Sequence, residues 1–309
     1  MNVESLIESA PLILTEAAVI EPMTQDPRLE MHQQLFNAPL IYKSEGRQAF
    51  YDLYKNYLDV ALQADLPMMI FSPTWRAGRD RIRAARIKRL LNHDAVVFMR
   101  ELRDILAPVQ HHVFVGGLIG SKEDCYRPDL APDEHSAERY HAWQVQQLAE
   151  AGVDFQLAAT LPNVAEARGV ARALRETGQP YFISFVINQK GHVLDGTKLE
   201  DAIDTIDRAA GQHPPFGYMV NCAYPSFLDM TALPQGARER FMGYQANASS
   251  KPHQDLDGSH MRQMEDIDDW AARMARLHRQ WGLKILGGCC GTGSDHLQRL
   301  VAKIRRPLS

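Results

Sequence analysis

The chain of 309 residues is poor in cysteine, in long apolar runs and in positive charge. Its four cysteines are far too few for a disulfide-stabilised scaffold. No apolar run reaches the roughly 18 residues that a transmembrane helix needs, so we expect no membrane span. Its 34 lysines and arginines are outnumbered by 38 acidic residues, giving a net charge of −4. This balance favours neither nucleic acid nor a membrane surface as a partner.

The N-terminus lacks the features of a secretory signal. Its first segment, MNVESLIESAPLIL, carries two glutamates and no basic residue, whereas a signal peptide begins with a basic region followed by an apolar one. We therefore expect a cytoplasmic protein, in which thiols stay reduced. Cysteines in that compartment are more often buried, metal-bound or catalytic than bridged.

Short apolar runs alternate with longer helical patterns along the whole chain. The runs predict eight strands, at residues 11–14, 68–71, 112–115, 154–159, 181–187, 218–221, 241–245 and 284–286. Helical patterns follow nearly all of them. The longest helical pattern, from Arg79 to Leu106, is basic. It is interpreted as a solvated face or as a contact between subunits, and the second interpretation would make the protein a homo-oligomer.

Strands that alternate with helices predict parallel pairing through crossover connections. Eight such units in a chain of this length predict a single (β/α)8 TIM barrel, an α/β fold. No Pro- or Ser-rich linker divides the chain, so we expect one domain over residues 1–309. The alternative is an open, doubly wound sheet, which is less favoured because no Gly-x-Gly-x-x-Gly follows the first strand.

Three of the four cysteines follow predicted strands. Cys222 follows the sixth strand, and Cys289 and Cys290 follow the eighth, inside Gly287-Gly288-Cys289-Cys290-Gly291-Thr292. Active sites of barrels are built at the carboxyl ends of the strands, so we expect these thiols to converge there. Three thiolates are a ligand set for a catalytic zinc ion, with the fourth position left for water or a substrate thiol whose pKa the ion lowers.

These cysteines also have other interpretations. Buried cysteine is a common core residue, and a vicinal disulfide of Cys289 and Cys290 would be strained and disfavoured in a reducing compartment. An adjacent pair flanked by glycines after a barrel strand, with Cys222 at another strand end, favours the zinc site instead. Cys125 lies in a polar loop and is expected to be inert.

Asn221-Cys222 and the Gly-Gly-Cys-Cys-Gly-Thr motif at 287–292 resemble the two zinc motifs of the homocysteine S-methyltransferases. Weaker supporting matches lie at 151–154, 160–163 and 194–199, so the resemblance covers most of the chain. It implies a (β/α)8 barrel in which Cys222, Cys289 and Cys290 bind zinc. It further implies a small-molecule thiol acceptor such as homocysteine, giving methionine, and a sulfonium methyl donor, either S-methylmethionine or S-adenosylmethionine.

The sequence departs from this family at two acidic positions. The family's first strand usually ends in Asp-Gly-Gly or Asp-Gly-Ala, where this chain has Thr15-Glu16-Ala17. Its fourth strand usually ends in Glu-Thr-x-Pro, where this chain has Ala159-Thr160-Leu161-Pro162. In the family these acids help hold the amino acid part of homocysteine, and an ammonium group is costly to bury without a carboxylate. Ala159 therefore argues against ordinary homocysteine binding, unless Glu16 substitutes from one position away.

Three residues are expected to bind substrate: Glu16, Thr160 and Asn247. Glu16, at the end of the first strand, points either into the barrel mouth or to solvent, and Asn247, after the seventh strand, is either a substrate ligand or an ordinary turn residue. Trp75 lines the pocket or packs in the core.

Besides a zinc methyltransferase of homocysteine, two functions stay open. One is a related zinc enzyme for a different thiol or sulfonium compound, and the other is a non-catalytic zinc-binding barrel.

Overall fold

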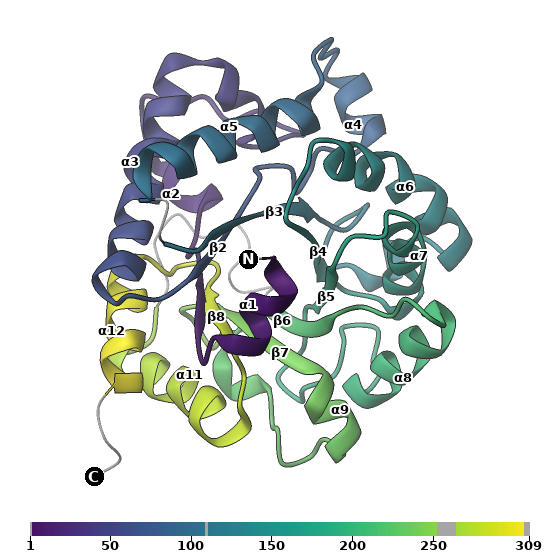
Figure 1. Ribbon diagram of the computed structural model, residues 1–309. Helices are drawn as coiled ribbons and strands as arrows, with labels where there is room; N and C mark the ends of the chain where they lie inside the picture. Colours follow the sequence, from purple (N-terminus) through teal and green to yellow (C-terminus); the bar gives the residue numbers. More distant parts are fainter. Residues whose placement is uncertain (1, 109–110, 252–263, 306–309) are drawn as a thin grey trace.

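The computed structural model describes residues 2–108, 111–251 and 264–305, and its centre is a closed barrel of parallel strands (Figure 1). Each strand pairs with the next in chain order, and the last pairs with the first. The strands are β1 (Ile13–Thr15), β2 (Met68–Phe71), β3 (Val113–Ile119), β4 (Phe155–Leu161), β5 (Tyr181–Phe185), β6 (Gly217–Ala223), β7 (Phe241–Ala246) and β8 (Ile285–Gly288). The predicted (β/α)8 barrel is confirmed.

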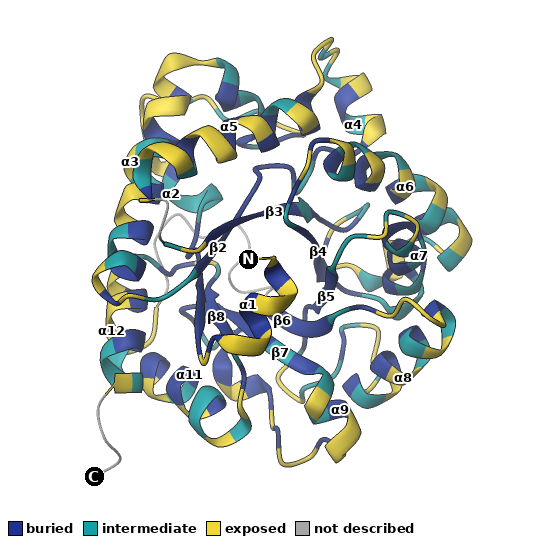
Figure 2. Cartoon of the chain, in the orientation of Figure 1, coloured by how far each residue is buried: buried dark blue, intermediate teal, exposed yellow. Residues whose placement is uncertain are grey.

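Helices surround the barrel with their buried sides on the strands and their exposed sides outward (Figure 2). They are α1 (Val3–Ser9), α2 (Ile20–Gln25), α3 (Ser44–Gln63), α4 (Arg79–Ala84), α5 (Leu91–Leu106), α6 (Glu134–Glu150), α7 (Val164–Arg175), α8 (Leu199–Ala210), α9 (Gln235–Arg240), α11 (Ile267–Trp281) and α12 (Ser294–Arg305). Short 3₁₀ helices lie at η1 (Ala38–Tyr42), η2 (Pro128–Leu130) and η3 (Pro225–Phe227). In the described part of the chain, none of the helices combines the length and apolarity that a membrane crossing requires.

Side-chain caps explain where two of these helices begin. The side chain of Asp133 accepts the backbone N–H of Ser136 before α6. The side chain of Asn163 accepts the N–H groups of Ala165 and Glu166 before α7. Both caps satisfy N–H groups that have no partner within the helix.

The amino end of the barrel is covered by α1, a helix that the sequence pattern did not predict (Figure 1). Its buried residues Val3, Leu6 and Ile7 pack in one apolar cluster with interior side chains that include Ile13 and Phe114. Because this end is filled by apolar side chains, we expect chemistry at the opposite, carboxyl end.

The third strand is longer than predicted. The predicted strand covers residues 112–115 and stops before Gly116-Gly117, but β3 runs through both glycines to Ile119. A Cβ atom on Gly116 would lie 2.5 Å from the ring of Phe155. The glycine therefore makes room for an aromatic side chain inside the barrel and does not end the strand.

The basic pattern from Arg79 to Leu106 was wrongly predicted as one helix. It forms two helices, α4 and α5, and Arg86 between them takes a left-handed backbone conformation with φ of 53°. A continuous helix would align Arg79, Arg83 and Arg86 at spacings of three and four, where like charges repel.

Candidate active site

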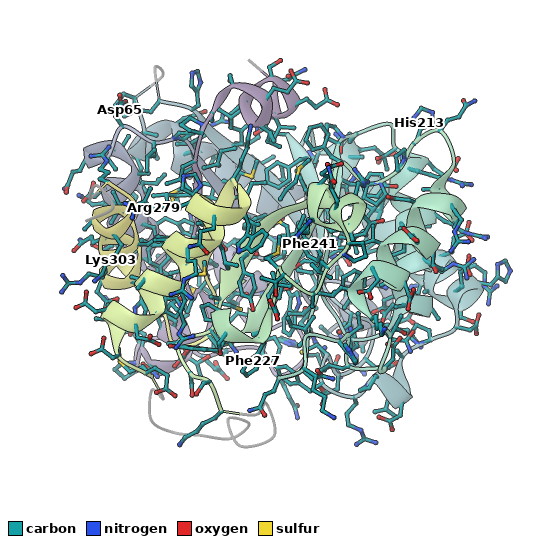
Figure 3. All side chains as sticks on the ribbon, turned by 90° about the horizontal axis from the view of Figure 1, so that it is seen from below. Asp65, His213, Phe227, Phe241, Arg279 and Lys303 are labelled. Carbon is teal, nitrogen blue, oxygen red and sulfur yellow. The ribbon has the colours of Figure 1, made fainter. Side chains whose placement is uncertain are left out.

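The sequence-predicted cysteines lie at the carboxyl end of the barrel. In Figure 3 the barrel is seen from the side, with Phe227 near one end and Asp65 and His213 at the other. Phe227 follows β6 and therefore marks the carboxyl ends of the strands. Asp65 precedes β2 and His213 precedes β6, so these two residues mark the amino ends. Cys222 lies at the end of β6, and Cys289 directly follows β8.

Cys222, Cys289 and Cys290 come together, although Cys222 is 67 residues away from Cys289 in the sequence. Their Sγ atoms all lie within 4.8 Å of one another. Cys222 and Cys289 are 2.7 Å apart and Cys289 and Cys290 are 4.0 Å apart. None of the four cysteines, Cys125 included, is disulfide-bonded, so the vicinal disulfide is not formed. Cys222 is buried and Cys290 is exposed, so the cluster is reached from the Cys290 side.

The electrostatics of the cluster favour a thiolate at Cys289. Hydrogen bonds from the Cys222 and Cys290 thiols lower the pKa of the Cys289 thiol well below its usual value, although burial opposes this shift. The thiolate is the form of cysteine that binds metal ions. The site is therefore prepared for a cation.

The sulfur atoms also fit the geometry of a tetrahedral metal site. Zn–S bonds of about 2.3 Å place the sulfurs of such a site about 3.8 Å apart. The two measured separations, 2.7 and 4.0 Å, lie on either side of this value. Among the residues that the structure describes, no His, Asp or Glu joins the group as a fourth ligand. Three protein ligands with an open position are typical of catalytic zinc sites and not of structural ones.

A strained backbone aims Cys222 at the cluster. Its φ is 54°, in the left-handed region, and the pairing of β6 with β7 shifts register between Asn221 and Ala223. Regular alternation along a strand would place the side chains of Asn221 and Cys222 on opposite faces. The bulge lets both reach the mouth of the barrel.

Asn221 ties three strand ends together. Its Oδ1 accepts the backbone N–H of Thr160 at 2.9 Å and the hydroxyl of Ser184 at 2.7 Å. Its Nδ2 is then turned toward the Sγ atom of Cys222, 3.4 Å away. In the sequence Asn221 stands out only as part of a motif, because an amide gives no sign of its partners there.

Thr160 and Asn247, two of the predicted substrate residues, differ in whether their side-chain oxygen already has hydrogen-bond partners within the protein. The hydroxyl of Thr160 accepts the Nε1–H of Trp75 at 2.6 Å and donates to the carbonyl of Ala159 at 2.6 Å, so it serves the protein structure. The Oδ1 atom of Asn247 is buried without a hydrogen-bond partner. A buried acceptor of this kind is the feature expected of a ligand contact.

Glu16 is buried, and its carboxyl group is engaged by the protein. Its Oε2 accepts the hydroxyl of Tyr54 and the backbone N–H of Phe71, both at 2.8 Å. Burial raises its pKa to about 8, and these two hydrogen bonds reduce the shift. Glu16 is therefore largely neutral at pH 7.

Several residues at this end were not predicted as site residues. The Phe36 ring stacks on Trp75 with centroids 5.8 Å apart, and the Arg76 guanidinium lies 5.4 Å from the Trp75 ring. Tyr126 is an electrostatic neighbour of the four cysteines, which add to the effect of burial in raising its pKa. Trp75 was considered as a pocket residue because it closely follows the predicted second strand, and the same position was the signal available for Arg76.

Comparisons with known proteins agree with this geometry. The family model described as Homocysteine S-methyltransferase matches residues 16–304. Homocysteine S-methyltransferase YbgG of Bacillus subtilis is 26% identical over 186 residues, which are 58% of this chain and 56% of the relative. Homocysteine S-methyltransferase 3 of Zea mays is 25% identical over 223 residues, which are 66% of this chain and 62% of the relative. The matches thus span less than two thirds of these relatives' own lengths.

The fold has solved counterparts. The metallated form of the homocysteine methyltransferase MmuM from Escherichia coli superposes with a TM-score of 0.72 over 97% of this chain and 99% of that chain, at 18% identity. Its oxidized form gives a TM-score of 0.74 at 19% identity. These likenesses extend to the whole barrel.

Proposed function

The chain belongs to the homocysteine S-methyltransferase family, and from this premise we propose that it transfers a methyl group from a sulfonium donor to a thiol bound at Cys222, Cys289 and Cys290. The observation that carries the proposal is the convergence of three sulfur atoms within 4.8 Å at the carboxyl end of the barrel. The metal that suits three thiolates and an open position is zinc.

The proposed chemistry is a displacement at carbon. The bond between the methyl carbon and the donor sulfur breaks, and a bond from that carbon to the acceptor sulfur forms. The electron pair of the broken bond stays on the donor, which leaves as a neutral thioether, and the acceptor's thiol proton goes to solvent. When bound, zinc would supply the thiolate by lowering the pKa of the acceptor thiol.

The chain's own residues have positioning roles in this proposal. Cys222, Cys289 and Cys290 would hold the ion, and the exposed position of Cys290 leaves a side from which a thiol enters. Asn221 holds Cys222 through its Nδ2 group, and Asn247 offers a buried acceptor to a substrate. Alignment of the donor methyl with the acceptor sulfur is what such a preorganised mouth contributes to rate.

A methyl-transfer assay tests the proposal. Protein loaded with zinc is incubated with S-methylmethionine or S-adenosylmethionine carrying a deuterated methyl group, together with homocysteine or another small thiol. We expect mass spectrometry to find the deuterated methyl group on the thiol, and to find none with Cys290→Ala. A protein that binds zinc but methylates no thiol from either donor would contradict the proposal and would favour a zinc enzyme for a different compound or a non-catalytic zinc-binding barrel.

A further inference from the structure

Arg76 lies beside the candidate active site and forms no salt bridge with any residue that the structure describes. Its Nη1 donates to the carbonyl of Glu123 at 2.9 Å, and its Nε is buried without an acceptor. Within the described ranges, no carboxylate oxygen lies within 4.0 Å of its guanidinium nitrogens. A guanidinium has five N–H donors in a fork that matches a carboxylate, so most of its capacity for hydrogen bonding is unused.

A chain of contacts joins Arg76 to the cysteine cluster. Its guanidinium lies 5.4 Å from the ring of Trp75, and Trp75 donates to Thr160. The backbone N–H of Thr160 in turn donates to Asn221, whose amide faces Cys222. Arg76 therefore lies on the same end of the barrel as the thiols.

Cys125 provides a second link between Arg76 and the cluster. Burial is the main reason that the pKa of the Cys125 thiol is raised to about 12, and the groups that act on it electrostatically include Cys290 and Arg76. Burial likewise lowers the pKa of Arg76, and the charge of Arg81 adds to this effect, whereas Cys125, Tyr140 and Asp124 oppose it. Arginine nevertheless stays protonated in proteins. A partly buried cation without an anion is unfavourable, and a bound carboxylate would relieve that cost.

The carboxylates near the described mouth accept hydrogen bonds from the protein. They include Asp124, which acts electrostatically on Arg76 and whose Oδ1 accepts the backbone N–H of Tyr126 at 2.9 Å. Glu16 is engaged by Tyr54 and Phe71, and Glu21 accepts the backbone N–H of Gly291 at 2.6 Å.

The remaining polar side chains are neutral. Thr15 accepts a hydrogen bond from Gln245 at 3.1 Å, and Ser184 donates to Asn221 at 2.7 Å. Ala159, at the end of β4, has no polar atom in its side chain. In the described part of the chain, the mouth therefore combines an arginine that forms no salt bridge with carboxylates that already accept hydrogen bonds from the protein.

We propose that Arg76 binds the carboxylate of the acceptor, and that the preferred acceptor is a mercaptocarboxylate without an ammonium group. This inference rests on the proposed S-methyltransferase function, since it names the acceptor class of that site. The guanidinium fork pairs with the carboxylate at one end of the substrate, while the thiol at the other end reaches the three cysteines. An ammonium group on the same molecule finds only carboxylates that already accept hydrogen bonds from the protein, and it therefore lowers the affinity.

Binding measurements without turnover separate this proposal from the proposed function. The ligands are methionine, its des-amino analogue (methylthiobutanoate) and the corresponding alcohol (methylthiobutanol), which share one carbon–sulfur chain. Calorimetry with zinc-loaded protein is expected to show the des-amino analogue binding at least about tenfold more tightly than either of the others. The alcohol loses the charged hydrogen bond to Arg76, and methionine brings an ammonium group that has no free carboxylate to pair with in the described mouth. Methionine binding as tightly as its des-amino analogue would overturn the proposal.

Variants of Arg76 assign the effect to this side chain. Arg76→Gln is expected to weaken binding of the des-amino analogue about 10- to 100-fold and to leave binding of the alcohol unchanged, whereas Arg76→Lys retains part of the affinity. Arg238→Gln is the matched control, because the Arg238 guanidinium lies 5.5 Å from the ring of Trp281, at the opposite end of the barrel. Thermal melting shows whether each variant is folded. An effect of Arg76→Gln no larger than that of Arg238→Gln, in folded protein, would contradict the proposal.

Discussion

The backbone N–H of Thr160 donates a hydrogen bond of 2.9 Å to the Oδ1 atom of Asn221, across the ends of β4 and β6. Both strand ends carry a left-handed residue at this point, with φ of 55° at Thr160 and 54° at Cys222. The hydrogen bond thus joins two strained turns at the mouth. It also holds the amide whose other end faces the Cys222 sulfur.

Replacing Asn221 should destabilise the barrel and the cysteine cluster together. Asn221→Ala leaves the buried donors of Thr160 and Ser184 without an acceptor, so we expect a loss of about 2–5 kcal/mol in the free energy of unfolding. Denaturant titration measures it. Ser184→Ala is the control, since it removes one of the two donors and keeps Asn221. A loss no larger for Asn221→Ala than for Ser184→Ala would contradict the linking role of Asn221.

Removing one cysteine of the cluster should abolish stoichiometric metal binding. We expect about one zinc per chain for the unchanged protein, since a catalytic site uses three protein ligands, and far less for Cys290→Ala. Elemental analysis of dialysed protein gives the ratio. Cys125→Ala, which replaces the buried cysteine outside the cluster, should keep its zinc. Unchanged zinc in Cys290→Ala would overturn the site assignment.

Gly287→Ala should be strongly destabilising because β8 approaches β1 closely at this point. A Cβ atom there would collide with the Thr15 hydroxyl and lie 2.8 Å from the Thr15 carbonyl oxygen. We expect the free energy of unfolding to fall by roughly 1–3 kcal/mol or more. In Gly236→Ala the added Cβ meets no atom within 4 Å, so its unfolding curve should be unchanged or slightly more stable. Equal stability of the two variants would contradict the close approach.

Glu16 should make the protein less stable as the pH rises. Its pKa is about 8 in the folded chain, against an ordinary value of 4.5, so between these values the folded state holds a proton that the unfolded state lacks. The stability contributed by the neutral carboxyl is complete below the ordinary pKa and is lost progressively as the pH rises to about 8.

Glu16→Gln removes this titration while keeping the size of the side chain. We expect denaturation midpoints of the unchanged protein to fall, relative to those of Glu16→Gln, from pH 5 to about pH 8 and to run parallel above it. A difference between the two proteins that stays constant over this range would show that Glu16 titrates normally.

The barrel and the grouping of three cysteines could be predicted from the sequence. Alternating strand and helix patterns imply parallel pairing, and parallel strands place their carboxyl ends at one edge. Cys222 and Cys289 therefore had to come near each other once the strands were located. Strand lengths were less predictable, as at Gly116, because the need for a glycine comes from a ring on another strand.

By itself, then, the sequence determined the architecture and the end of the barrel where the thiols meet. Only the tertiary structure decided which side chains point into the mouth of the barrel and which hydrogen bonds they form. Alternation alone would turn Cys222 away from Asn221, and the register shift in β6 brings both side chains to the site. The hydrogen bond between Trp75 and Thr160 joins segments that are far apart in the sequence. Likewise, only the folded chain shows that Arg76 forms no salt bridge with another described residue. Such contacts depend on which loops the closed barrel places side by side, and local sequence patterns carry no record of that.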